Sequence, residues 1–354
     1  MSDAQYQTAL ALFGQGRHAE GSQLLGQAAQ TGHVPSMSLL GGQLLAGRGI
    51  EPDPVAGVRL IMAAAERGGA FACALAATVF ASGFSGQPDW KRGLDFLQRS
   101  AELGFAAAQA QLRLLSGFKA GTDWQRLRRA INIAAWRKPP RSVTLCEDPQ
   151  ILAFAGVISP EICEAMIDAA RPRLGPAKVY DAVGGGNTTA SERRHSAAEF
   201  AIGDMDMVLL AVRERLCGLV GMPTVNADGS QVLHYKVGDR FTNHFDFFDP
   251  VFPGHAHHLA VGGQRLFTVL LYLNEAGLEG GETDFPMLKV RHRGGQGDVL
   301  LFRNIDADGQ LDRRTLHAGL SPTAGEKWLL STWVRDRAAQ STGDPQYIEA
   351  LSGR

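Results

Sequence analysis

Hydrophobic and polar positions alternate with two different periods along the chain. Through residues 1–115, Ala and Leu recur at helical spacing among Gly and Gln, which predicts amphipathic helices. From residue 231 the apolar positions fall into short alternating runs bounded by Gly, Asp and Pro, which is typical of strands. The runs are QVLHYKV, FTNHFDFF, RLFTVLLYLN, ETDFPM, GDVLLF, RRTLHAGL and KWLLSTWVR. We therefore expect an α+β multidomain chain in which helices come first and an antiparallel sandwich or jelly roll follows.

The helical third carries an internal repeat of 36 residues. Several registers that share one period predict a solenoid of stacked helical hairpins. In each unit the Asp can cap the second helix, and a Gly after the last helical turn suits the left-handed conformation. The registers are Gly21, Gly57 and Gly93; Ala29, Ala65 and Ala101; Gly32, Gly68 and Gly104; Gly47 and Gly83; and Asp53 and Asp89.

Two segments of the repeats, AAERG at 64–68 and SAELG at 100–104, resemble the Sel1-like repeats, which are relatives of tetratricopeptide arrays. This resemblance implies a stacked helical scaffold that binds a protein or peptide, either the substrate or a partner. A purely structural arm, which stabilises or dimerises the molecule, is the alternative, because a fold does not by itself determine a function.

A basic segment follows the repeats. The sequence TDWQRLRRAINIAAWRKPPR predicts a capping helix and then a proline linker. Between Trp124 and Arg141 there are six Lys or Arg and no acid. This pattern fits a solvated helix face, or a basic docking strip for an acidic partner or RNA. The expected parts are residues 1–115 for the repeats, 116–145 for the capping helix and linker, 146–340 for the β domain and 341–354 for a C-terminal tail.

The overall charge is balanced, with 35 Lys plus Arg against 36 Asp plus Glu. No global field therefore favours nucleic acid or an anionic membrane, and we expect neither as a partner. The four cysteines form no C-x-x-C pair, and the start of the chain lacks a basic region followed by an apolar run. These features predict a cytoplasmic protein without an export signal or a membrane span.

Metal-ligating residue types gather in the β-rich part. His244 and Asp246 stand two apart in FTNHFDFF, so in a strand both side chains leave the same face. With His317 at the end of a later strand they would form a set of two histidines and one carboxylate, which would occupy one side of an octahedral metal and leave three positions open. Lys327 follows ten residues after His317, and a hairpin of that length would return it to the barrel interior.

Five motifs in this region are similar, in their order, to those of the prolyl 4-hydroxylase-type Fe(II)/2-oxoglutarate-dependent dioxygenases. They are YKVGDRFTNHFD (235–246), GGQRLFTVLLYLN (262–274), EGGETDFP (279–286), GDVLLF (297–302) and HAGLSPTAGEKWLLSTWVR (317–335). The resemblance extends from the helix at 160 to about residue 337. It implies a double-stranded β-helix core, that is, a jelly roll, with supporting helices.

The resemblance also implies roles for single residues. It implies that His244, Asp246 and His317 are the catalytic iron ligands. Lys327 would receive the distal carboxylate of 2-oxoglutarate, Tyr235 would donate a hydrogen bond to it, and Thr268 would line the same pocket. A buried dicarboxylate needs such a charge, because an unpaired buried carboxylate is very costly. Fe(II) would then be the metal, 2-oxoglutarate and O2 the cosubstrates, and ascorbate the reductant.

Substrate residues are expected around a Gly-rich segment, VYDAVGGGNTTASERRHS at 179–196. Its glycines lack the spacing of a dinucleotide fingerprint, so we interpret it as a lid over the metal. Arg194 resembles part of an R-x-S motif in the same family, and Arg194 and Trp333 are the candidates for peptide binding. Trp333 fits the barrel core equally well.

Three histidines in PGHAHHLAVGG need a separate interpretation. His255, His257 and His258 lie close in sequence, but no carboxylate or cysteine accompanies them, so a solvated loop is preferred to a second metal site. His234, next to Tyr235, should point to the opposite strand face from the metal.

These features together predict an Fe(II)/2-oxoglutarate dioxygenase that hydroxylates a protein or peptide, at a prolyl residue, with the repeats recruiting the substrate or a partner. Hydroxylation of another side chain or of a free small molecule is an alternative, since the iron motifs specify the oxidant and not the target. An alternative of another class is a repeat-based scaffold with a catalytically idle barrel.

Overall fold

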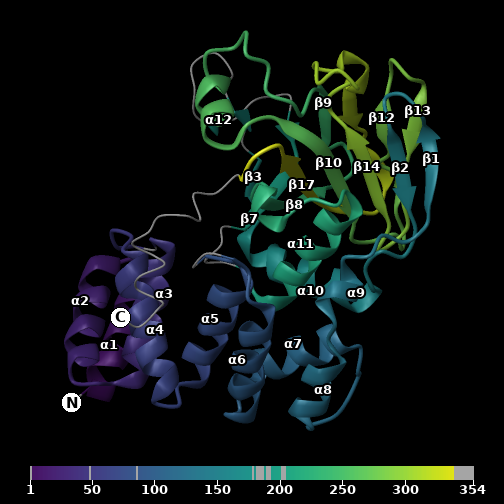
Figure 1. The fold of residues 1–354 in the computed structure, drawn as a ribbon. Coiled ribbons are helices and arrows are strands. Elements are labelled where there is room, and N and C mark those ends of the chain that lie inside the picture. Colours follow the sequence, from purple (N-terminus) through teal and green to yellow (C-terminus); the bar gives the residue numbers. More distant parts are fainter. Residues whose placement is uncertain are drawn as a thin grey trace. The chain divides into compact units, whose positions relative to one another are not determined.

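The chain divides into two compact units, one built mainly from residues 1–133 and the other mainly from 134–200 and 212–340. The division falls within the segment 116–145 that was expected to link the repeats to the β domain. The computed structural model describes residues 2–47, 49–84, 87–177, 179–180, 187–188, 193–200 and 205–338. Most of the expected lid and the whole expected tail at 341–354 lie outside these residues. Figure 1 shows the elements of each unit.

The first unit is a series of helical hairpins that follows the 36-residue repeat. Helices α2, α4 and α6 begin at residues 18, 54 and 90, and α3, α5 and α7 begin at 34, 70 and 106. The bounds are α1 Ser2–Gly14, α2 His18–Gln30, α3 Val34–Ala46, α4 Pro54–Glu66, α5 Ala70–Ala81, α6 Trp90–Glu102, α7 Ala106–Ser116 and α8 Trp124–Ala130. The predicted helical-repeat solenoid is confirmed, and the capping segment begins as a further hairpin helix, α8.

Local chemistry sets the helix ends of this unit. The carboxylates of Asp53, Asp89 and Asp123 accept hydrogen bonds from the backbone amides three residues later and cap α4, α6 and α8. Gly57 and Gly93 lie where α4 and α6 cross their neighbours: an added Cβ would lie 2.8 Å from the Gly41 oxygen and 2.9 Å from the Ala77 oxygen, respectively. Only glycine permits this approach, which explains two members of one register in the repeat.

The second unit is built on two antiparallel sheets. The eight-stranded sheet has the order β1-β2-β14-β10-β17-β8-β7-β3, and the five-stranded sheet has the order β13-β12-β15-β9-β6. The eight-stranded sheet contains β1 Ser142–Cys146, β2 Ile151–Phe154, β3 Gly175–Pro176, β7 Ser196–Phe200, β8 Ser230–Tyr235, β10 Arg265–Tyr272, β14 Val299–Arg303 and β17 Lys327–Arg335. The other contains β6 Arg193–Arg194, β9 Arg240–His244, β12 Thr283–Phe285, β13 Val290–His292 and β15 His317–Gly319. Two short pairs, β4 Val179–Tyr180 with β5 Asn187–Thr188 and β11 Glu279–Gly280 with β16 Pro322–Ala324, complete the strands.

The core of the second unit lies between these strands. Residues of β8, β10, β14 and β17 that alternate with outward-facing neighbours meet Phe285 of β12. The cluster consists of Ile151, Leu233, Tyr235, Leu270, Tyr272, Phe285, Leu300, Phe302 and Leu329. This jelly-roll arrangement confirms the α+β prediction, and the supporting helices are α10 Pro160–Ala170 and α11 Met207–Leu219. In the described residues, no helix is long and apolar enough to cross a membrane.

Two expectations about local structure were wrong. The segment FTNHFDFF is not one strand, because β9 ends at His244 and Asp246 follows in the turn beyond it. The histidine segment is not a loop but a short helix, α12 His255–Gly262, which ends before Gly263 at a φ of 71°. Apolar Leu259 and Val261 and two alanines favour a helix there more than the histidines oppose it.

Candidate metal centre

The three predicted ligands meet where β9 and β15 pair. His244 and His317 are direct partners in the antiparallel register, which places their rings side by side although they are far apart in sequence. The Nε2 atom of His244 lies 3.6 Å from Oδ1 of Asp246, and Nε2 of His317 lies 3.5 Å from Oδ2. One ligand atom from each residue lies within 4.8 Å of the others, so all three can hold one metal ion.

Backbone carbonyls orient both imidazole rings. Nδ1 of His244 lies 2.8 Å from the oxygen of Thr242, and Nδ1 of His317 lies 3.0 Å from the oxygen of Thr315. A carbonyl oxygen only accepts, so Nδ1 carries the proton in each ring and donates it. The lone pair of each neutral ring is then on Nε2, toward Asp246. A hydrogen bond of this kind from the second ring nitrogen is typical of histidine ligands.

Asp246 is buried and ionised. Burial by itself would raise its pKa, but His317 and His244 in their protonated forms, together with Arg265, outweigh burial and lower the pKa to about 2. When a metal takes the place of the protons on Nε2, the donor set is two imidazoles and one carboxylate on one side of an open space. That set suits Fe(II), because ligands on one side of an octahedral ion leave the remaining positions for other molecules.

A cavity opens beside the three ligands. Its empty space of about 390 Å³ includes open solvent at the mouth. Alternate residues of β8 and β17 supply half of its lining residues, as expected where one strand face points into a barrel. The lining residues are Gln231, Leu233, Tyr235, Phe241, His244, Asp246, Leu270, Thr283, His317, Gly319, Lys327, Leu329, Ser331 and Trp333.

Lys327 enters this cavity as a buried charge. It pairs with Tyr235 across β17 and β8 and is only 1% exposed. Its Nζ lies 5.3 Å from the centre of the Tyr235 ring and 5.9 Å from that of Tyr272. Burial lowers the pKa of Lys327 to about 8, against the opposing charge of Glu282. Among the described residues no carboxylate forms an ion pair with it, so the cavity suits a ligand that brings its own negative charge.

Known proteins share this part of the chain. Residues 230–335 match the model of the 2OG-Fe(II) oxygenase superfamily. Prolyl 4-hydroxylase 1 of Arabidopsis thaliana is 33% identical over 205 residues, which cover 54% of this chain and 70% of that protein. The chain belongs to the 2OG-Fe(II) oxygenases. Within that superfamily it is a dioxygenase related to the prolyl 4-hydroxylases. A second relative, probable prolyl 4-hydroxylase 10 of Arabidopsis thaliana, is 28% identical over 236 residues, which cover 61% of this chain and 75% of that protein.

Solved structures resemble the two units of this oxygenase separately. The viral collagen prolyl hydroxylase of Paramecium Bursaria Chlorella virus-1 is 28% identical and covers 52% of this chain and 95% of its own, with a TM-score of 0.40. A Sel1 repeat protein from Oxalobacter formigenes is 19% identical and covers 39% of this chain and 61% of its own, with a TM-score of 0.30. At such TM-scores, the fold rests on the topology described above.

The remaining candidate residues of the oxygenase lie in different places. Trp333 lines the cavity and is 8% exposed, with the Arg265 guanidinium 3.7 Å from its ring centre. Arg194 is exposed on the edge strand β6, opposite Arg240 of β9. Thr268, which was expected to line the cavity, is absent from its wall, and its hydroxyl lies 2.8 Å from Oδ2 of Asp246.

The other histidines of the oxygenase contact neighbours away from the metal ligands. His234 stacks on Trp328 and lies 3.0 Å from a carboxylate oxygen of Glu326, so it faces away from the cavity as expected. His258 stacks on Phe248, and burial, helped by Arg265 and Arg335, lowers its pKa. In the described residues the α12 histidines take part in no group of three metal-ligating side chains.

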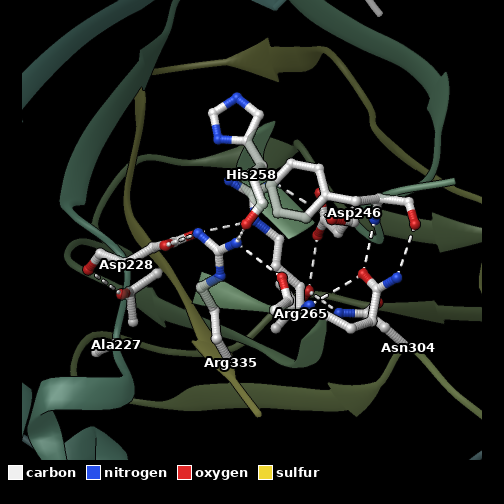
Figure 2. A network of polar contacts seen from close by, with 12 residues as sticks. Ala227, Asp228, Asp246, His258, Arg265, Asn304 and Arg335 are labelled. Carbon is white, nitrogen blue, oxygen red and sulfur yellow. Dashed lines mark hydrogen bonds and ion pairs between the residues drawn. The ribbon is translucent and has the colours of Figure 1, made fainter. Parts of the chain in front are cut away.

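A polar network behind the metal ligands was missed in the sequence. Asp228 accepts hydrogen bonds from Arg265 at 2.9 Å and from Arg335 at 3.1 Å, and Figure 2 shows this pair together with Asp246 and Asn304. These residues come from distant strands and loops, and none lies at a recognisable spacing from another. The one signal in the sequence was an arginine at a strand end beside an apolar run, Arg265 in β10 and Arg335 in β17. Such an arginine indicates a buried counter-charge.

Proposed function

We propose that this oxygenase hydroxylates a prolyl residue of a protein or peptide, and that the helical repeats recruit that substrate or a partner. The observation that carries the proposal is the presence, in one cavity, of a two-histidine, one-carboxylate set and a buried lysine. The relation to prolyl 4-hydroxylases supports the choice of proline. Transfer of an oxygen atom to a C–H bond needs both a metal site and a place for the oxidised cosubstrate, and the cavity offers both.

The metal would be held by His244, Asp246 and His317. When bound, Fe(II) supplies oxidation by O2, in which 2-oxoglutarate becomes succinate and CO2 and one oxygen atom enters a C–H bond of the substrate. The protein contributes placement. The two carbonyl-bound rings are already oriented before a metal arrives, so little ordering remains to be done on binding.

Lys327 would bind the distal carboxylate of 2-oxoglutarate. Its ammonium is buried without a described ion pair, and the ligand would complete the pair with a charge-assisted hydrogen bond. Tyr235 lies beside it, and its hydroxyl reaches toward Gly319, where the absent side chain leaves room: an added Cβ would lie 3.4 Å from that oxygen. We assign the Tyr235 hydroxyl as a second donor to the same carboxylate.

The apolar part of the wall would keep water from the reaction. Leu233, Leu270 and Leu329 line the same cavity as the lysine and the metal ligands, and exclusion of water protects a reactive oxidant from side reactions. Trp333, at the metal-ligand end, and the exposed Arg194 are the residues we propose to contact the peptide. Ascorbate would serve as the reductant that returns the metal to Fe(II).

Turnover of 2-oxoglutarate tests the enzyme proposal. Purified protein with Fe(II), ascorbate and 2-oxoglutarate should form succinate, and a proline-rich peptide should gain about 16 Da, the mass of one oxygen atom. His244→Ala should abolish both, and full activity in that variant would refute the ligand assignment. Succinate without a modified proline would favour another side chain or a small molecule. No turnover with any substrate would favour the idle scaffold.

Recruitment by the repeats needs a separate measurement. The KM for a long protein substrate should rise when residues 1–140 are removed, whereas the KM for a short proline peptide should stay the same. Circular dichroism and thermal unfolding must first establish that the shortened chain folds. Equal KM values for the long substrate would leave the repeats with a structural role.

A further inference from the structure

A chain of hydrogen bonds leads from the buried amide of Asn304 through Thr268 to Asp246. The Thr268 hydroxyl lies 2.8 Å from Oδ2 of Asp246, and Nδ2 of Asn304 lies 3.0 Å from the same hydroxyl. Asn304 and Thr268 are both 0% exposed, and Asp246 is 6% exposed. Figure 2 shows Asp246 and Asn304 within one polar network.

The chemistry of the groups fixes the direction of this chain. An ionised carboxylate only accepts, so the hydroxyl of Thr268 must donate to Asp246. A hydroxyl has one proton, so it can only accept from Asn304, which must present its NH2 group and not its oxygen. The orientation of the Asn304 amide group therefore follows from the acceptor role of the Asp246 carboxylate. Asn304 donates to Thr268, and Thr268 donates to Asp246.

Both supporting residues are held in place by the sheet. Thr268 lies in the middle of β10, with Phe302 of β14 and Trp333 of β17 as its partners. Asn304 follows β14; its backbone amide donates to the Leu266 oxygen at 2.8 Å, and its carbonyl accepts from the Asp312 amide at 3.1 Å. These contacts fix the main-chain positions of both residues beside a central part of the eight-stranded sheet.

Asp246 needs such support because it lies beyond the end of β9. Its backbone oxygen accepts a hydrogen bond from Arg265 at 3.2 Å, which holds the main chain but leaves the carboxylate free to rotate. A hydrogen bond from the Thr268 hydroxyl holds the carboxylate itself. Its hydroxyl occupies one lone pair of Oδ2, the oxygen 3.5 Å from Nε2 of His317, whereas Oδ1, 3.6 Å from Nε2 of His244, receives no hydrogen bond from Thr268 and keeps both lone pairs for a metal.

We propose that Thr268 and Asn304 are positioning residues that fix the rotation of the Asp246 carboxylate and restrict it to one oxygen donor for the metal. This inference rests on the proposed metal centre. It assigns Thr268 a different task from the one suggested by family resemblance, since it acts on the metal ligand and not on 2-oxoglutarate. A carboxylate that gives one oxygen leaves one more position of the ion open for the cosubstrates.

Metal affinity provides the test, with Co(II) as the probe for the full-length protein. Thr268→Val keeps the shape of the side chain and removes the hydroxyl, so the Kd for Co(II) should rise by about 10-fold or more, the usual effect of losing a residue that supports a ligand. The visible absorption bands of bound Co(II) should also shift, because they report its coordination. Thr268→Ser keeps the hydroxyl and should restore most of the affinity and the original bands.

A matched control is available on the neighbouring strand. Thr332 of β17 is also buried, at 1% exposed, and pairs with Val269, so its side chain lies on the other face of the sheet. Thr332→Val makes the same chemical change and should leave the Kd for Co(II) unchanged. Equal losses in Thr332→Val and Thr268→Val would indicate general destabilisation and overturn the proposal.

Asn304→Ala tests the second member of the chain. Removing its donor should weaken Co(II) binding by about 3-fold alone and should add nothing in the Thr268→Val background, because linked residues are not additive. Additive losses of Co(II) affinity in the double variant would overturn the proposed chain from Asn304 through Thr268 to Asp246. If Thr268→Val does not fold, Asn304→Ala decides alone, and unchanged Co(II) affinity and spectrum in that variant would reject the proposal.

Kinetics separate this inference from the alternatives. Thr268→Val should lower kcat at saturating Fe(II) and leave the KM for 2-oxoglutarate within about threefold, a difference of under 1 kcal/mol. A raised KM with unchanged Co(II) affinity would make Thr268 a cosubstrate contact and refute the positioning role. If the wild-type protein binds no Co(II), the proposed metal centre itself fails; normal binding by both wild type and Thr268→Val rejects only the positioning role.

Discussion

Two buried cations of the oxygenase domain have opposite surroundings. Arg335, 4% exposed, shares the carboxylate of Asp228 with Arg265 and donates to the backbone oxygens of His258 and Gly263. Lys327, 1% exposed, has no ion pair among the described residues. A buried charge that the protein leaves without a counter-charge needs one from outside. The comparison therefore separates a cation that the protein pairs within its own fold from a cation that we propose binds the cosubstrate.

The two cations also differ in what they cost the ligand-free protein. Burial lowers the pKa of Lys327 from 10.5 to about 8. Each pH unit of such a shift corresponds to about 1.4 kcal/mol, so protonated Lys327 costs on the order of 3 kcal/mol of stability. In the proposed function, the distal carboxylate of 2-oxoglutarate would offset this cost on binding. The ion pair of Arg335 with Asp228 carries no comparable stability cost, because each charge has a counter-charge within the protein.

The largest predicted effect is on Lys327. Lys327→Met should lower kcat/KM for 2-oxoglutarate by about 100-fold or more, since removing one partner of a buried charge pair costs roughly 2–5 kcal/mol. The same change should raise the free energy of unfolding of the ligand-free protein by about 1–3 kcal/mol, because an apolar side chain replaces a buried charge. Steady-state kinetics and urea unfolding measure the two effects.

Lys236→Met is the matched control for that substitution. Lys236 is an exposed lysine directly after β8, and its loss should change neither quantity. A Lys327→Met protein that is less stable and still binds 2-oxoglutarate tightly would show that Lys327 belongs to the fold and not to the ligand.

The second prediction concerns the satisfied pair. Asp228→Asn should lower the free energy of unfolding by about 3–5 kcal/mol, because two arginines then lose their shared counter-charge in a largely buried place. The Kd for 2-oxoglutarate of the protein that remains folded should change by less than about threefold, since Asp228 does not line the cavity. Asp308→Asn, at an exposed turn, is the control and should leave stability unchanged. A loss of ligand affinity without a loss of stability would reverse the two roles.

The sequence predicted the repeats well because their signals are local. A helix cap such as Asp53 and a left-handed glycine such as Gly68 act within a few residues, and the period of the repeat makes them recognisable. The ligand set was also predictable, since His244, Asp246 and His317 stand in motifs whose order resembles a known family. Strand alternation was nevertheless the wrong reason for pairing His244 with Asp246, because β9 ends between them.

The supporting network was not predictable from the sequence. Thr268, Asn304 and Asp228 each find their partners on strands that are distant in the chain, and their spacing carries no period. Whether a buried threonine faces a cosubstrate or a metal ligand depends on the path of the chain after β9. Helix α12 was missed for another reason: three histidines dominated the interpretation, although alanines and Leu259 in the same segment favour a helix.

The third prediction is a pH dependence that only the unpaired cation produces. In the ligand-free enzyme Lys327 loses its proton as the pH rises through about 8, and neutral lysine cannot pair with a carboxylate. Above that pH the Kd for 2-oxoglutarate should increase by about tenfold per pH unit, because binding then requires uptake of one proton. The groups that face Lys327 are Tyr235, Tyr272 and Glu282. Calorimetric titration between pH 7 and 10 measures the slope.

With rising pH, the free energy of unfolding should change in the direction opposite to the affinity for 2-oxoglutarate. The pKa of Lys327 is lower in the folded protein than in the unfolded chain, so between about pH 8 and 10.5 the unfolded chain binds more protons. The Lys327 contribution to the free energy of unfolding therefore rises with pH across this window, while below pH 8 its cost is complete. Lys327→Met should remove both trends. Trends that persist in this variant would have to come from another group.

The smallest predicted effect comes from Glu282, whose charge opposes the lowering of the Lys327 pKa. Glu282→Gln removes this charge and keeps the shape, so the pKa of Lys327 should fall further. The fall should be well under one pH unit, because Glu282 is a partly solvated charge. The midpoint of the pH dependence of 2-oxoglutarate binding should move to lower pH by the same amount. Glu279→Gln, an exposed neighbour on β11, should leave the midpoint in place. If Glu282→Gln instead moved the midpoint by more than about one pH unit, an effect expected of a close ion pair, Glu282 would be a direct counter-charge, and Lys327 would belong with Arg335 among the cations that the protein itself satisfies.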